Sequence, residues 1–246
     1  MKQALLALPI VAFALIAAKP APVPPPLPSI VAPEAIAANK ANHLFIQLST
    51  GGTVEIVLRP DLAPNHIQRI QTLVRRGFYN GLTFHRVISG FMAQGGDPKG
   101  TGQGGSELPD LKAEFTEVPF LRGTIGAART DSPDTANSQF FIMLSPHLTL
   151  DGQYTVFGRV IGGMGFVDAI EKGEPPANPT RILQASIAAD NRPPPPQAAQ
   201  VAPPPPSLIS NAPSAGHPAA GPAVPAPPSI RLPDPPKPRP RQQPQQ

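Results

Sequence analysis

Alternation of apolar and polar positions dominates the middle of the chain. The first clear case is HLFIQLSTGGTVEIVL, in which two apolar, β-branched runs flank Gly51 and Gly52. Because a glycine pair supplies the backbone angles that a tight turn needs, this segment predicts a β-hairpin. Further strand-like runs follow, separated by glycines and polar residues: LTFHRVI, FMAQGGD, TIGAAR, SQFFIML, YTVFGRVI and the closing RILQASIAA.

Helical periodicity occurs in two places. The segment from Asp61 to Tyr79 repeats apolar residues at helical spacing, with Pro64 suited to the first turn and Gly77 to the end. The segment MGFVDAIEKG shows a second helical pattern that Gly173 is expected to stop. Many short strands and only two helices predict a mainly β fold, either an antiparallel barrel or a sandwich.

Proline marks the limits of the folded part. Of the 38 prolines in 246 residues, eight precede Glu34 and 20 follow Asn191. Proline fixes φ and lacks an N–H, so these flanks cannot form helices or sheet interiors. We therefore expect one domain over residues 41–190, a proline-rich linker over 19–40 and a disordered, proline-rich basic tail over 191–246.

The first 18 residues predict export. MKQALLALPIVAFALIAAKP combines a basic residue, an apolar run of signal-peptide length and small residues at its end. This is the layout of a secretory signal peptide, and the run is short for a membrane span. We therefore expect a periplasmic protein. The alternative is an uncleaved anchor, which would hold the domain on the membrane facing the periplasm.

Charge and residue chemistry exclude several classes of function. The net charge of +4 comes from the flanks, because the central region carries 13 basic and 14 acidic residues. A nucleic-acid-binding face is therefore not expected. The chain has no cysteine, and its histidines lack metal-ligand spacing, so no metal or other cofactor is expected. The loop GDPKGTGQGG lacks the ending of a phosphate-binding loop and predicts a flexible surface turn.

One set of segments combines apolar and hydrogen-bonding residues unusually densely. These are FHRVISGFMAQGGDPKGTGQGG, GAARTDSPDTANSQFFIML and LDGQYTVFGRVIGGM. In order and spacing they resemble the cyclophilin family of peptidyl-prolyl isomerases, and the resemblance extends from about Asn42 to Ala189. It implies an eight-stranded antiparallel β-barrel capped by two α-helices.

The resemblance also implies a site for proline-containing polypeptides. Arg86 matches the family's catalytic arginine, and Phe141 and Leu150 match the floor and wall of its proline pocket. The other implied substrate-binding residues are Phe91, Met92, Gln94, Ala128, Arg129 through its backbone, and Tyr154. Two positions, Thr149 and Tyr154, depart from many eukaryotic members and resemble exported bacterial ones, so tight cyclosporin binding is not implied.

Two functions follow from this resemblance. The first is a monomeric isomerase that assists the folding of exported proteins. The second is a proline-peptide-binding or chaperone-like module that uses the same pocket with little turnover. The presence of Arg86 together with the pocket residues favours the first.

Overall fold

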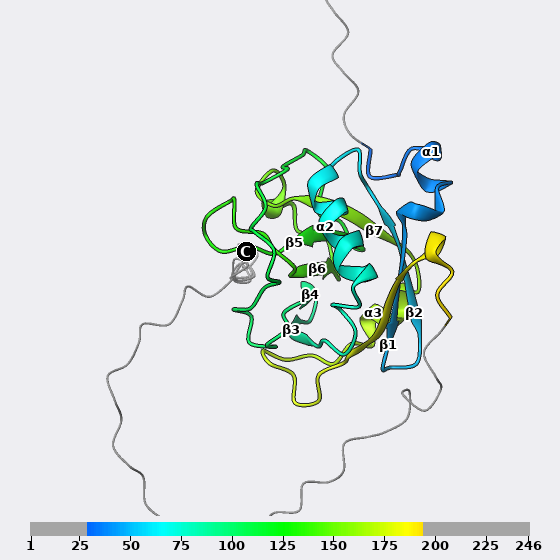
Figure 1. Cartoon of the computed structure of the whole chain (residues 1–246). Helices are drawn as coiled ribbons and strands as arrows, with labels where there is room; N and C mark the ends of the chain where they lie inside the picture. Colours follow the sequence, from blue (N-terminus) through cyan, green and yellow to red (C-terminus); the bar gives the residue numbers. More distant parts are fainter. Residues whose placement is uncertain (1–28, 194–246) are drawn as a thin grey trace, which may run out of the picture.

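The computed structural model describes residues 29–193, which form one curled antiparallel sheet with short helices (Figure 1). The strands are β1 (His43–Leu48), β2 (Thr53–Leu58), β3 (Phe84–Ile88), β4 (Met92–Gly95), β5 (Thr124–Ala127), β6 (Phe140–Met143), β7 (Val156–Gly162) and β8 (Ile182–Ile187). The helices are α1 (Glu34–Ala37), α2 (Pro64–Arg75) and α3 (Met164–Asp168), with 3₁₀ turns η1 (Lys40–Asn42), η2 (Leu148–Leu150) and η3 (Ala188–Asp190). The predicted signal segment and most of the predicted tail lie outside the described residues.

The eight strands curl into a barrel. Their order is β3-β4-β6-β5-β7-β2-β1-β8, so β3 and β8 are the two edges. Backbone hydrogen bonds connect these edges: the N–H of Phe84 donates to the carbonyl of Thr180 at 3.0 Å, and that of Ile182 to the carbonyl of Leu82 at 2.8 Å. Pairing of the edges leaves fewer unpaired backbone groups. The predicted mainly β, eight-stranded fold is confirmed.

The first hairpin and the long helix have their predicted bounds. Strands β1 and β2 pair antiparallel around the turn at Gly51, whose φ is 96°. Helix α2 begins at Pro64, which needs no N–H in the first turn. Gly77 follows its end with a φ of 71°, the left-handed angle that terminates many helices.

The remaining helices differ from the sequence prediction. Helix α3 has five residues and ends at Asp168, well before Gly173. Gly173 does not stop a helix; it pairs with Val87 as an extended bridge beside β3. Helix α1, of four residues, was not predicted, because it buries none of its residues and so leaves no helical pattern of apolar positions.

Strand alternation divides the interior into two apolar clusters. Successive side chains of a strand point to opposite faces of the sheet. In β6, Phe140 and Ile142 therefore face the barrel core, whereas Phe141 and Met143 face a second cluster outside it. Both faces are covered, so all four residues are buried.

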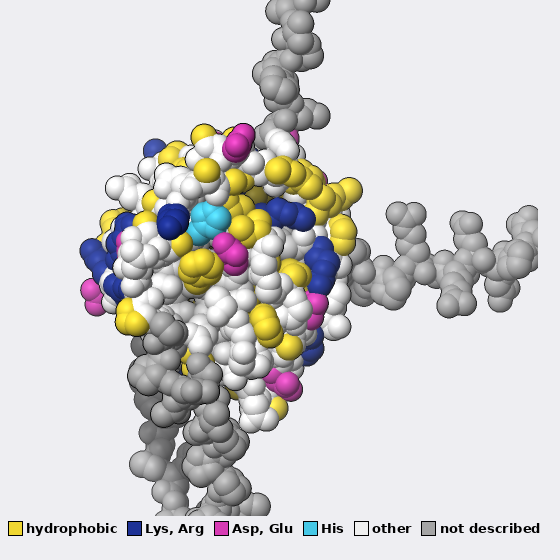
Figure 2. All heavy atoms as spheres, turned by 90° about the vertical axis from the view of Figure 1, so that its right-hand side faces the viewer, with side chains coloured by type: hydrophobic (Ala, Val, Ile, Leu, Met, Phe, Trp, Pro, Cys, Tyr) yellow, Lys and Arg dark blue, Asp and Glu magenta, His cyan; other side chains and the backbone are white. Residues whose placement is uncertain are grey.

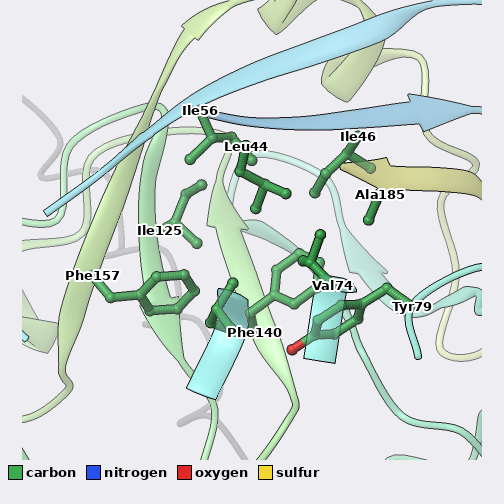
Figure 3. Close-up of a pocket in the computed structure, with 10 residues that line it drawn as sticks. Leu44, Ile46, Ile56, Val74, Tyr79, Ile125, Phe140, Phe157 and Ala185 are labelled. Carbon is green, nitrogen blue, oxygen red and sulfur yellow. The ribbon is translucent and has the colours of Figure 1, made fainter. Parts of the chain in front are cut away.

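The barrel core is closely filled. The first cluster, shared by strands and by the inner faces of α2 and α3, surrounds an internal cavity of about 10 Å³ with an apolar lining (Figure 3). Tyr79 reaches this region, and its hydroxyl donates to the carbonyl of Ser138 at 3.0 Å. A space this small and apolar is at the lower limit for even one water molecule. The inside of the barrel is therefore packed core, with no room for a peptide.

The outer face of β1 and β2 carries mixed charges. Figure 2 shows basic and acidic side chains interspersed with hydrophobic ones on this side of the molecule. Neither positive nor negative charge therefore predominates on this face, in agreement with the balanced charge of the central sequence. Within residues 29–193, no helix has the length and apolar character needed to cross a membrane.

Candidate active site

The second apolar cluster contains most of the residues that the sequence assigned to a proline pocket. It lies outside the barrel core, on the outward faces of β4 and β6, together with residues from the segments that follow these two strands. Its members are Phe91, Met92, Val118, Phe120, Ala128, Phe141, Met143, Leu150, Tyr154 and Val156. Six of these were predicted site residues, so the fold brings together segments that are far apart in the sequence.

Three strands align the polar and apolar members in one row. Arg86 of β3 pairs with Gln94 of β4, and Gln94 pairs with Phe141 of β6. Phe141 in turn pairs with Gly126 of β5. Directly paired residues of an antiparallel sheet project on the same face. The row therefore places a cation, an amide and an aromatic ring side by side on the outer face of the barrel.

Gly126 makes room for the ring of Phe141. A Cβ atom at this position would lie 2.3 Å from Cζ of Phe141 and 2.8 Å from Cε1 of Phe120. Only glycine lets the two rings approach the β5 backbone this closely. The rings of Phe141 and Phe120 stack with centroids 5.6 Å apart, and Tyr154 meets Phe141 edge-on at 5.8 Å. Phe141 is thus fixed from three sides.

Leu150 and Phe91 approach the cluster from two different turns. Leu150 ends the 3₁₀ turn η2 and is 1% exposed. The ring of Phe91 contacts that of His147, with centroids 4.5 Å apart, and its carbonyl accepts the N–H of Leu144 at 2.8 Å. These contacts connect the turn before β4 to the segment after β6, and so hold the two sides of the predicted pocket together.

A buried amide pair lies beside Arg86. The Nε2 of Gln94 donates to the Oε1 of Gln139 at 2.9 Å, and the Nε2 of Gln139 donates to the carbonyl of Gly104 at 2.7 Å. The Oε1 of Gln94 is buried with no hydrogen-bond partner among residues 29–193. Because each donor is oriented by the next acceptor, Gln139 fixes the Gln94 amide. Sequence analysis assigns no role to Gln139, although it directly precedes Phe140 and Phe141 in one of the segments that resemble the family.

The side chain of Arg129 is fully engaged by its own surroundings. Its guanidinium donates to the backbone carbonyls of Gln153, Thr130 and Asp131. It also lies over the ring of Tyr154, 4.5 Å from the centroid, as cations do over aromatic faces. The site prediction for Arg129 concerns only its backbone. The contacts of its side chain give that side chain a structural role.

Ala128 is completely buried in the cluster, and its N–H donates to the carbonyl of Gln139 at 3.0 Å. Its N–H is not free to bind another main chain.

The side chain of Arg86 is held at the edge of the site. Its Nε donates to Oε2 of Glu174 at 2.7 Å, and the arginine side chain is 17% exposed. Its Nη1 atom is buried and has no hydrogen-bond partner in the described part of the chain. No hydrogen bond within the described residues engages Nη2 either, so the two Nη nitrogens are the donors left for a group that a ligand would bring.

The glycine-rich loop after β4 is organised around Asp97. The carboxylate accepts the backbone N–H groups of Lys99 at 2.8 Å, Thr101 at 2.8 Å and Gly102 at 2.6 Å. Burial alone would raise the pKa of Asp97, but these hydrogen bonds and one from Gly104 hold it below its ordinary value. The N–H groups that a phosphate would need are already bound to a carboxylate. Residues 29–193 also contain no group of three His, Asp or Glu side chains placed to hold a metal ion.

The comparison with known families identifies the kind of protein to which this chain belongs. Residues 45–187 match the family described as cyclophilin type peptidyl-prolyl cis-trans isomerase/CLD. The chain belongs to this family. Cyclophilins of this type are peptidyl-prolyl cis-trans isomerases, so the chain is an enzyme whose substrates are proline-containing peptides.

Two relatives illustrate the similarity. A probable peptidyl-prolyl cis-trans isomerase of Brucella suis is 49% identical over 174 residues, which cover 64% of this chain and 88% of the relative. The human peptidyl-prolyl cis-trans isomerase-like 1 is 42% identical over 151 residues, covering 58% of this chain and 90% of that protein.

Solved cyclophilin structures have the same fold. The cyclophilin AquaCyp293 from Hirschia baltica superposes with a TM-score of 0.58 at 27% identity, covering 67% of this chain and 84% of that one. A cyclophilin-type isomerase from Cryptosporidium parvum, crystallised in the presence of the dipeptide Ala-Pro, gives a TM-score of 0.56 at 30% identity. The alignment covers 59% of this chain and 98% of that chain. The roles of individual residues in this cyclophilin remain predictions.

Proposed function

We propose that this cyclophilin isomerises X–Pro bonds without a covalent intermediate, with Arg86 as the catalytic donor and the outer apolar cluster as the proline pocket. Phe91, Met92, Phe141 and Leu150 would bind the proline ring. Gln94 and the backbone near Arg129 would hold the flanking peptide, so that one side of the bond rotates against a fixed partner.

The chemistry requires no nucleophile. Rotation about a peptide bond is slow because amide resonance raises a barrier of about 20 kcal/mol. In the twisted transition state this resonance is lost, and the imide nitrogen regains a lone pair that can accept a hydrogen bond. A guanidinium is always charged and donates to that nitrogen only in the twisted state, so it stabilises the transition state selectively.

The row of Arg86, Gln94 and Phe141 carries this proposal. It sets a charged donor beside a hydrogen-bonding amide and an apolar ring on one face of three paired strands. The Nη nitrogens of Arg86, which make no hydrogen bond within residues 29–193, support the assignment of Arg86 because they are the donors that a substrate would satisfy.

The test is a protease-coupled isomerisation assay on an Ala-Pro peptide. A hydrogen bond from a charged donor contributes about 1.5–3 kcal/mol. Arg86→Ala should therefore lower kcat/KM about 10- to 150-fold. Arg76→Ala, which removes an exposed arginine that follows α2, is the matched control and should leave the rate unchanged. Equal rates for wild type and Arg86→Ala would contradict the mechanism.

We further propose that the enzyme acts on exported proteins in the periplasm. The support is the amino-terminal sequence MKQALLALPIVAFALIAAKP, which has a signal-peptide layout. Expression of the full chain in a bacterial host, followed by fractionation and mass measurement of the amino terminus, tests this. A protein cleaved near Ala18 in the periplasmic fraction is the expected result. An intact amino terminus in the membrane fraction would indicate an anchor, and an intact chain in the cytoplasm would contradict export.

A further inference from the structure

The segment between α3 and β8 runs along the outer edge of β3, with which no other strand of the sheet pairs. Val87 and Gly173 exchange both of their backbone hydrogen bonds, at 2.8 Å and 2.9 Å. Gly173 has a φ of 148°, and a Cβ there would lie 2.5 Å from Cα of Pro176. A glycine is therefore needed at the position that fixes how this segment lies against β3.

This pairing places Glu174 beside Arg86. In an antiparallel bridge, the residue after Gly173 lies next to the residue before Val87. The carboxylate of Glu174 accepts the Nε–H of Arg86 at 2.7 Å, although the two residues are 88 positions apart in the sequence. The Glu174 side chain is 51% exposed and that of Arg86 is 17% exposed. The contact therefore reaches from the surface to the edge of the site.

The nitrogens of the Arg86 guanidinium have different surroundings. A guanidinium presents its donors in a fixed, planar fork. Glu174 binds the Nε side of this fork, whereas the Nη1 atom is buried without a partner in the described residues. The carboxylate thus fixes the plane of the guanidinium by a donor that the reaction does not need. The two Nη nitrogens make no hydrogen bond within the described residues, so they are the donors that remain for the substrate.

We propose that Glu174 is a positioning residue, which orients the guanidinium of Arg86 so that its Nη nitrogens face the bound X–Pro bond. The inference rests on the catalytic role proposed for Arg86. Without Glu174, the long arginine side chain samples other rotamers, and the fraction of molecules with a correctly placed donor falls. The substrate still binds in the apolar pocket, so the loss appears in kcat and not in KM.

A carboxylate beside a catalytic cation also weakens the positive electrostatic potential of that cation. This second effect of Glu174 changes kcat in the opposite direction to the orienting effect. If screening of the charge were the main effect, removal of Glu174 would raise kcat. Because Glu174 is half exposed, water and salt weaken its Coulomb effect on Arg86. The orienting effect needs only a short hydrogen bond, here 2.7 Å, and does not depend on the net charge of Glu174. We therefore expect the orienting effect to dominate.

The experiment measures kcat and KM for Glu174→Ala and Glu174→Gln, each in the wild-type and Arg86→Ala backgrounds. Glu174→Ala should lower kcat about three- to tenfold with KM within about twofold of wild type, as for loss of one positioning contact. Glu174→Gln retains an oxygen that accepts the Nε–H, so its kcat should stay within about twofold of wild type. Glu171→Ala, an exposed carboxylate in the same segment, is the control and should change neither constant.

The second background separates positioning from general damage. In Arg86→Ala, the further change Glu174→Ala should have no effect on the residual rate, because nothing remains to be oriented. The ¹⁵Nε resonance of Arg86 should shift in Glu174→Ala and keep its wild-type position in Glu171→Ala.

Each other outcome overturns the inference. An unchanged or increased kcat in Glu174→Ala, while Arg86→Ala is deficient, would reject positioning and leave the proposed function intact. An equal loss from Glu174→Ala in both backgrounds would show a structural effect unrelated to Arg86. Wild-type activity in Arg86→Ala would reject the proposed function and this inference together.

Discussion

The substitution Gly126→Ala tests whether the proposed site requires the rings of Phe141 and Phe120 to lie close to the β5 backbone. The added Cβ would lie 2.3 Å from Cζ of Phe141, whereas carbon atoms in contact are normally about 3.5–4.0 Å apart. Phe141 and Phe120 are both 0% exposed and stack on each other, so neither ring can swing into solvent. One ring, or the strand itself, must move.

The expected cost follows from this overlap. Overpacking of a closely filled interior costs about 1–3 kcal/mol. In a domain of about 150–250 residues, each kcal/mol lowers Tm by about 2–4 °C, so the variant should melt about 2–12 °C below wild type. Because Phe141 is the predicted floor of the proline pocket, kcat/KM should fall as well, although no predicted catalytic residue is changed.

The measurements are thermal unfolding and the protease-coupled assay on the purified variant. Gly165→Ala is the control, because a Cβ at that helical position meets nothing within 4 Å. Adding Phe141→Leu to Gly126→Ala should recover stability, since the smaller side chain removes the overlap, but should not recover activity. A Gly126→Ala protein with wild-type Tm and wild-type kcat/KM would refute the reasoning.

Two further predictions concern buried polar groups. Tyr79→Phe removes the hydroxyl that donates to the carbonyl of Ser138, and should lower the free energy of unfolding by about 1–3 kcal/mol in urea denaturation, with activity retained. Burial lowers the pKa of His85 below 6.5, so near that pH the unfolded chain binds a proton that the folded protein does not. Stability should therefore fall as pH drops below 6.5, by at most about 1.4 kcal/mol per pH unit from this group, and His85→Leu should flatten the dependence measured between pH 5 and 8. Parallel pH curves for the two proteins would contradict this assignment.

Local signals predicted most of the fold. The hairpin at Gly51 and helix α2 depend on glycine, proline and apolar spacing within a few residues, and both have their predicted bounds. Helix α3 is shorter than its pattern, and Gly173, which was expected to stop it, pairs instead with β3, a contact between residues distant in sequence. The periodicity of apolar positions within one segment gives no information on its pairing with a distant strand.

Sequence analysis assigns residues of the proposed site where a family motif covers them, and it does not assign the partners that these residues gain through strand pairing. The segment from Phe84 to Asp97 resembled the family closely enough to assign Arg86 and its neighbours. Glu174 lies outside the three matching segments and reaches the site through a bridge to β3. Gln139 lies within one of them, but its amide contact with Gln94 follows only from the pairing of β4 with β6. Their positions follow only from which strands are neighbours in the barrel.

The adjacent residues Phe140 and Phe141 show how closely folding and activity are coupled in this barrel. Strand β6 lies between β4 and β5, so one face of it completes the core and the other forms the floor of the proposed pocket. A shift of β6 by one residue would exchange the two rings between these clusters and move Phe141 out of the row with Arg86 and Gln94. The register is secured by the pairing of Phe141 with Gly126, where no side chain larger than hydrogen fits beneath the ring. The contact that makes Gly126 necessary for packing therefore also keeps the predicted catalytic arginine and pocket in line.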